Sequence, residues 1–189
     1  MTFCQIKCDI NNNLTSIVFP GNVTSTYEYD ALNRLTVKIE QGVETRLAYN
    51  ANNQVISQTN GQAVKTVFSY DSLGRLAQKT QGLLTPEQST SSFGYDSNSN
   101  MVFITNGLNK TIFYQYNALN QRVLETKAHA VDTTTLDPDN IDYSGYTRSK
   151  AVAYDEDANP EIITKADNTT ITYIYDSMDR VTQVRHNNV

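Results

Sequence analysis

The residues of this chain that could carry out chemistry recur at a regular spacing. An Asp or Asn follows a Tyr at seven places, of which Tyr29-Asp30 is the first. A ladder of carboxylates could bind Ca²⁺, which prefers oxygen ligands. An Asp or Asn at the first position of a turn, however, accepts hydrogen bonds from the backbone N–H groups ahead of it. Because some of these places carry Asn in place of Asp, we expect turns here, and neither a metal nor another cofactor.

Other residue types that support catalysis or metal binding are few and isolated. Cys4 and Cys8 would lie about 13 Å apart on one strand, at ~3.3 Å per residue, whereas a disulfide requires Cα atoms within about 7 Å. We therefore expect free, partly buried thiols. His129 and His186 are far apart in the sequence, and neither occurs in a hydrolase or zinc-site motif. We expect the protein not to be an enzyme.

Composition and charge exclude several kinds of partner. The 189-residue chain has a net charge of −5 and no run of Lys or Arg, so it lacks the clustered positive charge that nucleic-acid binding requires. No apolar stretch approaches the ~20 residues of a membrane-spanning helix, and we expect no membrane span. Hydrophobic residues make up 39% of the chain, below the ~45–50% typical of globular domains. A thin sheet with polar faces fits this composition better than a thick core.

The chain consists of a repeated segment about 21 residues long. If the Tyr of each pair is taken as an anchor, successive anchors are 20, 21, 25, 21, 38 and 21 residues apart. A segment with Cys8 in place of the Tyr precedes them and completes eight units. The seven pairs are Tyr29-Asp30, Tyr49-Asn50, Tyr70-Asp71, Tyr95-Asp96, Tyr116-Asn117, Tyr154-Asp155 and Tyr175-Asp176.

Each unit has the pattern of a β-hairpin. An apolar or aromatic residue stands two positions before the anchor, on the same face of a strand. Four positions after the anchor, six of the eight units carry Asn, Asp or Gly (Gly74 is one), the residue types that tolerate a positive φ. A turn that ends in such a residue closes a hairpin with a bulge. A second turn separates the units, marked by pairs such as Asn60-Gly61 and Asn106-Gly107.

These patterns predict an all-β protein with essentially no helix. We expect about eight tandem antiparallel hairpins in one curved, twisted sheet, in which units pack only on their neighbours. Residues 1–189 would form a single array, with residues 127–147 inserted as a loop between two repeats. The outer strands would expose unpaired backbone groups, so we expect edge-to-edge self-association. A four-bladed β-propeller with two units per blade is the alternative fold.

The pattern Y-x-Y-D-x-x-G/N-R-L, repeated over roughly residues 4–186, resembles the YD (Rhs) repeat. Its family includes bacterial Rhs polymorphic toxins, components of insecticidal toxin complexes and the teneurins. The resemblance implies a fragment of a hollow β-shell from a secreted or surface-delivered bacterial protein. The partners would then be the remainder of that shell and its enclosed polypeptide. We find no counterpart of the family's self-cleaving aspartyl segment, so we expect a piece of a longer protein.

Aromatic residues suggest a second function. Residues two positions before the anchors, and two Tyr of the insert, could stack against sugar rings, and loops such as the insert often carry binding sites. These residues are Tyr27, Phe68, Phe93, Tyr114, Tyr143, Tyr146 and Tyr173. Packing between strands explains the same aromatic stripe, and the insert could be a flexible excursion at one edge of the sheet. The sequence therefore favours a non-catalytic shell segment, and the alternative is an adhesion module that binds glycans or a partner protein.

Overall fold

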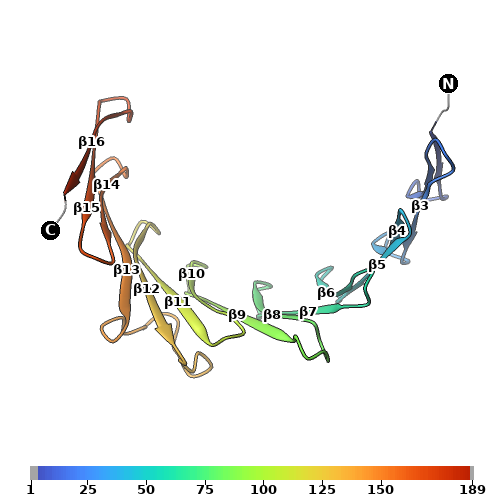
Figure 1. The fold of residues 1–189 in the computed structure, drawn as a ribbon, viewed down its shortest axis with the longest axis horizontal. Helices are drawn as coiled ribbons and strands as arrows, with labels where there is room; N and C mark the ends of the chain where they lie inside the picture. Colours follow the sequence, from blue (N-terminus) through green and yellow to red (C-terminus); the bar gives the residue numbers. More distant parts are fainter. Residues whose placement is uncertain (1–3, 188–189) are drawn as a thin grey trace. The chain divides into compact units, whose positions relative to one another are not determined.

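The computed structural model describes residues 4–187, which form strands and turns without any helix. The sixteen strands lie in one open sheet, in which each strand is hydrogen-bonded to the strands before and after it in the chain (Figure 1). This confirms the predicted all-β array of antiparallel hairpins. The strand order has no crossover and no separate four-stranded blades, which excludes the propeller.

The chain divides into two units, Met1–Thr90 and Ser91–Val189. The first contains β1 (Gln5–Cys8), β2 (Leu14–Val18), β3 (Thr24–Tyr29), β4 (Leu35–Glu40), β5 (Val43–Tyr49), β6 (Val55–Thr59), β7 (Lys65–Tyr70) and β8 (Leu76–Gln81). The boundary falls within β9 (Ser89–Tyr95). The second contains β10 (Met101–Thr105), β11 (Lys110–Tyr116), β12 (Arg122–His129), β13 (Thr147–Tyr154), β14 (Pro160–Lys165), β15 (Thr170–Tyr175) and β16 (Val181–Asn187).

The anchor residues end the odd-numbered strands, and the turn begins directly after them. Tyr29 is the last residue of β3. The Oδ1 atom of Asp30 then accepts the backbone N–H groups of Leu32, at 2.9 Å, and Arg34, at 3.0 Å. The register with β4 shifts between Glu28 and Tyr29, as a bulge requires. The predicted hairpin turn with a bulge is therefore confirmed in this unit.

The residue four positions after the anchor has a positive φ in all eight units. Six are of the types that favour this conformation, but Ser99 (67°) and Ala158 (70°) adopt it as well. The N–H of Ala158 donates to the carbonyl oxygen of Asp155 at 3.2 Å, the same bond that closes the other anchor turns. The turn geometry therefore outweighs the local preference of these two residues. The other six are Asn12, Asn33, Asn53, Gly74, Asn120 and Asp179.

The second turns expected at Asn60-Gly61 and Asn106-Gly107 are present. The side-chain oxygens of Asn60 and Asn106 each accept two backbone N–H groups ahead of them. The positive φ falls three residues later, at Ala63 and Asn109. These second turns thus repeat the geometry of the anchor turns.

Four hydrophobic residues of the described chain are buried, and three of them lie in the second unit. Val102, Phe103 and Phe113 form the cluster, and Phe113 is fully buried. Gly94 lies opposite Phe103, and Phe103 lies opposite Phe113, so the three share one face. A Cβ atom at Gly94 would lie 2.0 Å from Cε1 of Phe103. The glycine therefore leaves the space that the Phe103 ring fills.

The connection between β12 and β13, residues 130–146, folds back onto this cluster. The ring of Tyr146 stacks on Phe113, with 4.5 Å between ring centres and 2° between ring planes. Val131, Leu136 and Ile141 also pack against the cluster. The insert, expected over residues 127–147, therefore covers part of the sheet, whereas residues 127–129 continue β12 and Thr147 begins β13.

Exposed residues dominate both outer strands of the described sheet. All four residues of β1 and all seven of β16 are exposed. Cys4 and Cys8 are free, as expected, but exposed where partial burial was expected, because β1 has a neighbour on one side alone. Self-association through these edges stays a prediction. Among the described residues there is no helix long and apolar enough to cross a membrane.

We expect Ala158→Gly to stabilise the protein by about 0.5–1 kcal/mol. A left-handed conformation costs a non-glycine residue roughly 1–2 kcal/mol, and the greater freedom of glycine in the unfolded chain offsets part of the gain. Urea unfolding measures the change. Ala118→Gly, at an exposed turn residue whose φ is not positive, is the matched control and should be neutral or destabilising. Equal effects of the two substitutions would contradict this account.

Gly94→Ala should destabilise the second unit by about 1–3 kcal/mol, the usual cost of inserting a methyl group into a filled space. The physical reason is the overlap of the new methyl group with the Phe103 ring. Gly145→Ala is the control, because no atom lies within 4 Å of its Cβ position. Thermal unfolding of both variants checks the prediction, and an unchanged midpoint for Gly94→Ala would refute the packing argument.

Candidate functional site

The hydroxyl of the anchor Tyr fastens its own hairpin to the preceding one. The hydroxyl of Tyr49 donates to the carbonyl oxygen of Leu35 at 2.8 Å, and Leu35 is the sixth residue after the preceding anchor, Tyr29. The bond recurs with the same offset at four other anchors, so it is a property of the repeat. These bonds run from Tyr70 to Val55, from Tyr116 to Met101, from Tyr154 to Arg122 and from Tyr175 to Pro160.

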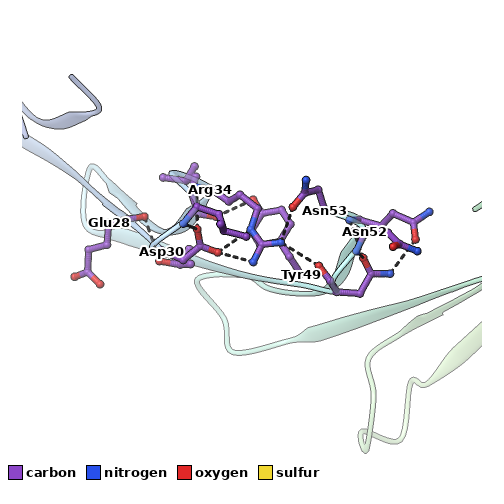
Figure 2. Close-up of polar contacts among 11 residues, drawn as sticks. Glu28, Asp30, Arg34, Tyr49, Asn52 and Asn53 are labelled. Atoms are coloured by element: carbon purple, nitrogen blue, oxygen red, sulfur yellow. Dashed lines mark hydrogen bonds and ion pairs between the residues drawn. The ribbon is translucent and has the colours of Figure 1, made fainter. Parts of the chain in front are cut away.

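The residue five positions after the anchor joins two successive turns. Figure 2 shows Arg34 between its own turn and the next. Its Nε donates to Oδ2 of Asp30 at 2.7 Å, and its Nη1 donates to the carbonyl oxygen of Asn50 and to Oδ1 of Asn53. The guanidinium carbon also lies 4.8 Å from the centre of the Tyr49 ring, within the range of a cation–π contact. One side chain thus contacts both hairpins.

Five other units have an equivalent bridge, from the fifth residue after one anchor to the fourth residue after the next. We call these bridges, together with the bond from Arg34 to Asn53, the turn ladder. The donors and acceptors are Asn13 to Asn33, Gln54 to Gly74, Asn100 to Asn120, Gln121 to Ala158 and Asn159 to Asp179. Sequence reasoning did not identify this position as functional. The signal was present, because all eight units carry Asn, Gln or Arg there.

The residues at the first and fifth positions after the anchor are chemically matched. The carboxylate of Asp30 pairs with Arg34, and the side-chain hydrogen bond from Arg34 holds the pKa of Asp30 below its ordinary value. Where the first residue is Asn, the fifth is Gln: Asn50 donates to Oε1 of Gln54 at 2.8 Å, and Asn117 to Gln121 at 2.7 Å. These side chains are thus used within the turn. No group of three metal-ligating side chains occurs among residues 4–187.

The structure does not bring the aromatic candidates for ligand binding into one site. Tyr27 donates its hydroxyl to Glu40 at 3.0 Å. The Tyr114 ring lies 4.9 Å from the guanidinium of Arg122, and its backbone carbonyl accepts the hydroxyl of Tyr143 at 3.0 Å. Tyr143 and Tyr146 both pack against the apolar cluster. The others lie half-buried within separate strands, Phe68 in β7, Phe93 in β9 and Tyr173 in β15.

Two hollows adjoin the insert in the second unit. The larger has a volume of about 890 Å³ and is lined by Ile104, Asn106, Lys110, Thr111, Ile112, Lys127, Ala128, His129, Val131, Gly145, Tyr146 and Thr147. The smaller, of about 550 Å³, is lined mainly by carboxylate and amide side chains, among them Asp96, Asp139 and Asp142. Tyr143 lines it too, and burial raises the pKa of this hydroxyl to about 12.

The hairpin array and its repeated turn bonds define a YD-repeat protein, which confirms the resemblance seen in the sequence. A model of the teneurin YD-shell family matches residues 21–137, more than half of the chain. The chain belongs to this family.

Solved structures of similar fold come from much longer chains. The crystal structure of TcdB2-TccC3-Cdc42 superimposes with a TM-score of 0.74 at 12% sequence identity, covering 97% of this chain and 10% of that one. The Photorhabdus luminescens Tc holotoxin pore with a mutated TccC3 gives a TM-score of 0.73, 12% identity and coverage of 97% and 10%. This chain thus spans about a tenth of those chains, and identity this low shows the fold alone. No curated protein matches the chain significantly.

We expect Asp30→Asn and Arg34→Gln each to lower the midpoint of urea unfolding, because each leaves a mismatched pair. The double variant reproduces the Asn50 and Gln54 combination that another unit already uses. The double variant should therefore lower the urea midpoint by less than half of the sum of the two single-variant decreases. Such non-additivity indicates direct coupling between two side chains. Additive losses in the double-mutant cycle would contradict the matching rule. The control is the corresponding pair of substitutions, Lys38→Gln and Glu40→Gln, at an ion pair that lies outside the turns.

Proposed function

We propose that this chain is a non-catalytic structural segment of a YD-repeat shell that encapsulates or presents a toxin or another effector polypeptide. The observation that carries the proposal is the repetition of the same two bonds, Tyr hydroxyl to backbone carbonyl and turn to turn, from hairpin to hairpin. Bonds of this kind align strands and engage the recurring Tyr, Asp and Asn side chains in structural contacts. The mechanism is containment, without turnover.

A wall must resist two failures, separation of its hairpins and slippage of their register. A slip by one residue would move every side chain of a strand to the opposite face. The Tyr hydroxyl and the turn ladder each fix the offset between successive hairpins, and one such hydrogen bond contributes about 0.5–1.5 kcal/mol. Because the bonds recur in unit after unit, a longer wall needs no new kind of contact. This suits a shell built from many repeats.

The partners that follow from this role are the remainder of the shell and the polypeptide inside it. The matched structures are about ten times longer than this chain, and one of them is a Tc holotoxin pore. This supports a secreted or surface-delivered bacterial toxin as the parent protein. Glycan adhesion is the competing proposal, and it receives less support because several of the candidate rings take part in internal contacts.

Substitutions of two Tyr residues in β11 distinguish the shell function from glycan adhesion. The hydroxyl of Tyr116 bonds to the preceding hairpin, so Tyr116→Phe should destabilise the protein by about 0.5–1.5 kcal/mol. Tyr114→Phe removes a hydroxyl without such a bond in the described structure and is the control. Containment further predicts that the wild-type protein retains no glycan on an array, and that Tyr114→Ala lowers stability by loss of strand packing.

The opposite pattern would favour adhesion. It consists of glycans retained by the wild-type protein and lost by Tyr114→Ala, with urea unfolding of that variant unchanged. A stable Tyr116→Phe variant would remove the argument for a wall held by its anchors, whatever the array shows.

A further inference from the structure

The larger hollow beside the insert has the dimensions and lining of a ligand-binding groove. Its volume of about 890 Å³ falls within the ~300–1,000 Å³ of typical ligand sites. Ile104, Ile112, Ala128 and Val131 are the aliphatic residues among its lining. Ile104 lies opposite Ile112, and Ile112 lies opposite Lys127, so these three side chains share one face of the sheet.

Three basic side chains gather at this groove. Lys110 lies directly opposite His129, and Lys127 precedes His129 by two residues on β12, so all three share one face of the sheet. All three are exposed. Groups of like charge directly opposite one another destabilise a sheet whenever both are charged. Packing within the chain therefore gives no reason for this arrangement.

Within the described part of the chain, these groups take part in no ion pair with a carboxylate. Glu125, two residues before Lys127 on the same strand, accepts a hydrogen bond from the hydroxyl of Ser149 at 2.7 Å. The groove lining contains no Asp or Glu, although the chain has 20 of them and a net charge of −5. A local excess of positive charge on an acidic protein attracts an anionic partner.

We propose that this groove binds a polypeptide segment in which apolar side chains alternate with Asp or Glu. The aliphatic surface suits apolar side chains, and the one aromatic ring of the lining, Tyr146, has a face covered by Phe113, which leaves less surface for a sugar. The two lysines lie on two neighbouring strands and match several carboxylates along a chain better than the single carboxylate of a fatty acid. The groove lies entirely within residues 104–147, so the inference does not depend on the shell role.

Fluorescence anisotropy with a labelled synthetic peptide of alternating Leu and Glu tests the proposal. The wild-type protein should bind this peptide and should bind neither a Leu–Lys peptide nor a Ser–Glu peptide. The double variant Lys110→Glu and Lys127→Glu should weaken binding about tenfold or more, because it opposes the peptide's charge. Binding should also weaken in about 1 M NaCl, where charges are screened beyond ~3 Å.

Lys65→Glu is the matched control, because Lys65 begins β7 as Lys110 begins β11 and is exposed outside the groove. It should bind the peptide like the wild type, and urea unfolding should show that all variants remain folded. The proposal is overturned if the folded wild-type protein does not bind the Leu–Glu peptide, or if the double variant binds it equally well. It also fails if the Ser–Glu peptide binds as tightly, which indicates charge alone, or if dodecanoate binds more tightly, which indicates a small amphiphile.

Discussion

A sheet that is one layer thick has little interior, and this limits how its strands can be held in place. The buried hydrophobic residues of the described chain are Val37, Val102, Phe103 and Phe113, so burial of apolar surface cannot align sixteen strands. Alignment depends on polar bonds between successive hairpins. The anchor hydroxyl reaches the preceding hairpin and the turn ladder reaches the next one. The offset between hairpins is thus defined by hydrogen bonds, which are directional, and not by a shared core.

The same constraint explains which residues the repeat can vary. The first and fifth residues after the anchor change together, Asp with Arg or Asn, and Asn with Gln, because each combination satisfies the donors and acceptors of one turn. The fourth residue can even be Ala158, although alanine disfavours a positive φ, since the turn bonds on either side determine the backbone. Most strand residues between the turns are exposed or half-buried, and Val37, Val102, Phe103 and Phe113 are the buried hydrophobic ones of the described chain.

The insert changes this regular pattern in one place. By stacking Tyr146 on Phe113 it gives the second unit a local second layer, and the fully buried side chains occur there. The two hollows beside the insert adjoin this thicker region. The repeat accounts for the uniform hairpin array, whereas the proposed groove combines residues 130–146 with side chains of β10, β11 and β12.

The hairpin units, the anchor turns and most positive-φ positions were predictable from the sequence, because each depends on bonds within about five residues, as at Asp30. Contacts between units were not, since the bridges from Arg34 and the bond from Tyr49 join residues of different units. The exposure of Cys8 and the packing of Gly94 under Phe103 could be derived only once the strand order was known. Tertiary packing places the insert over Phe113. The sequence of residues 130–146 has no periodic pattern from which this position could be predicted.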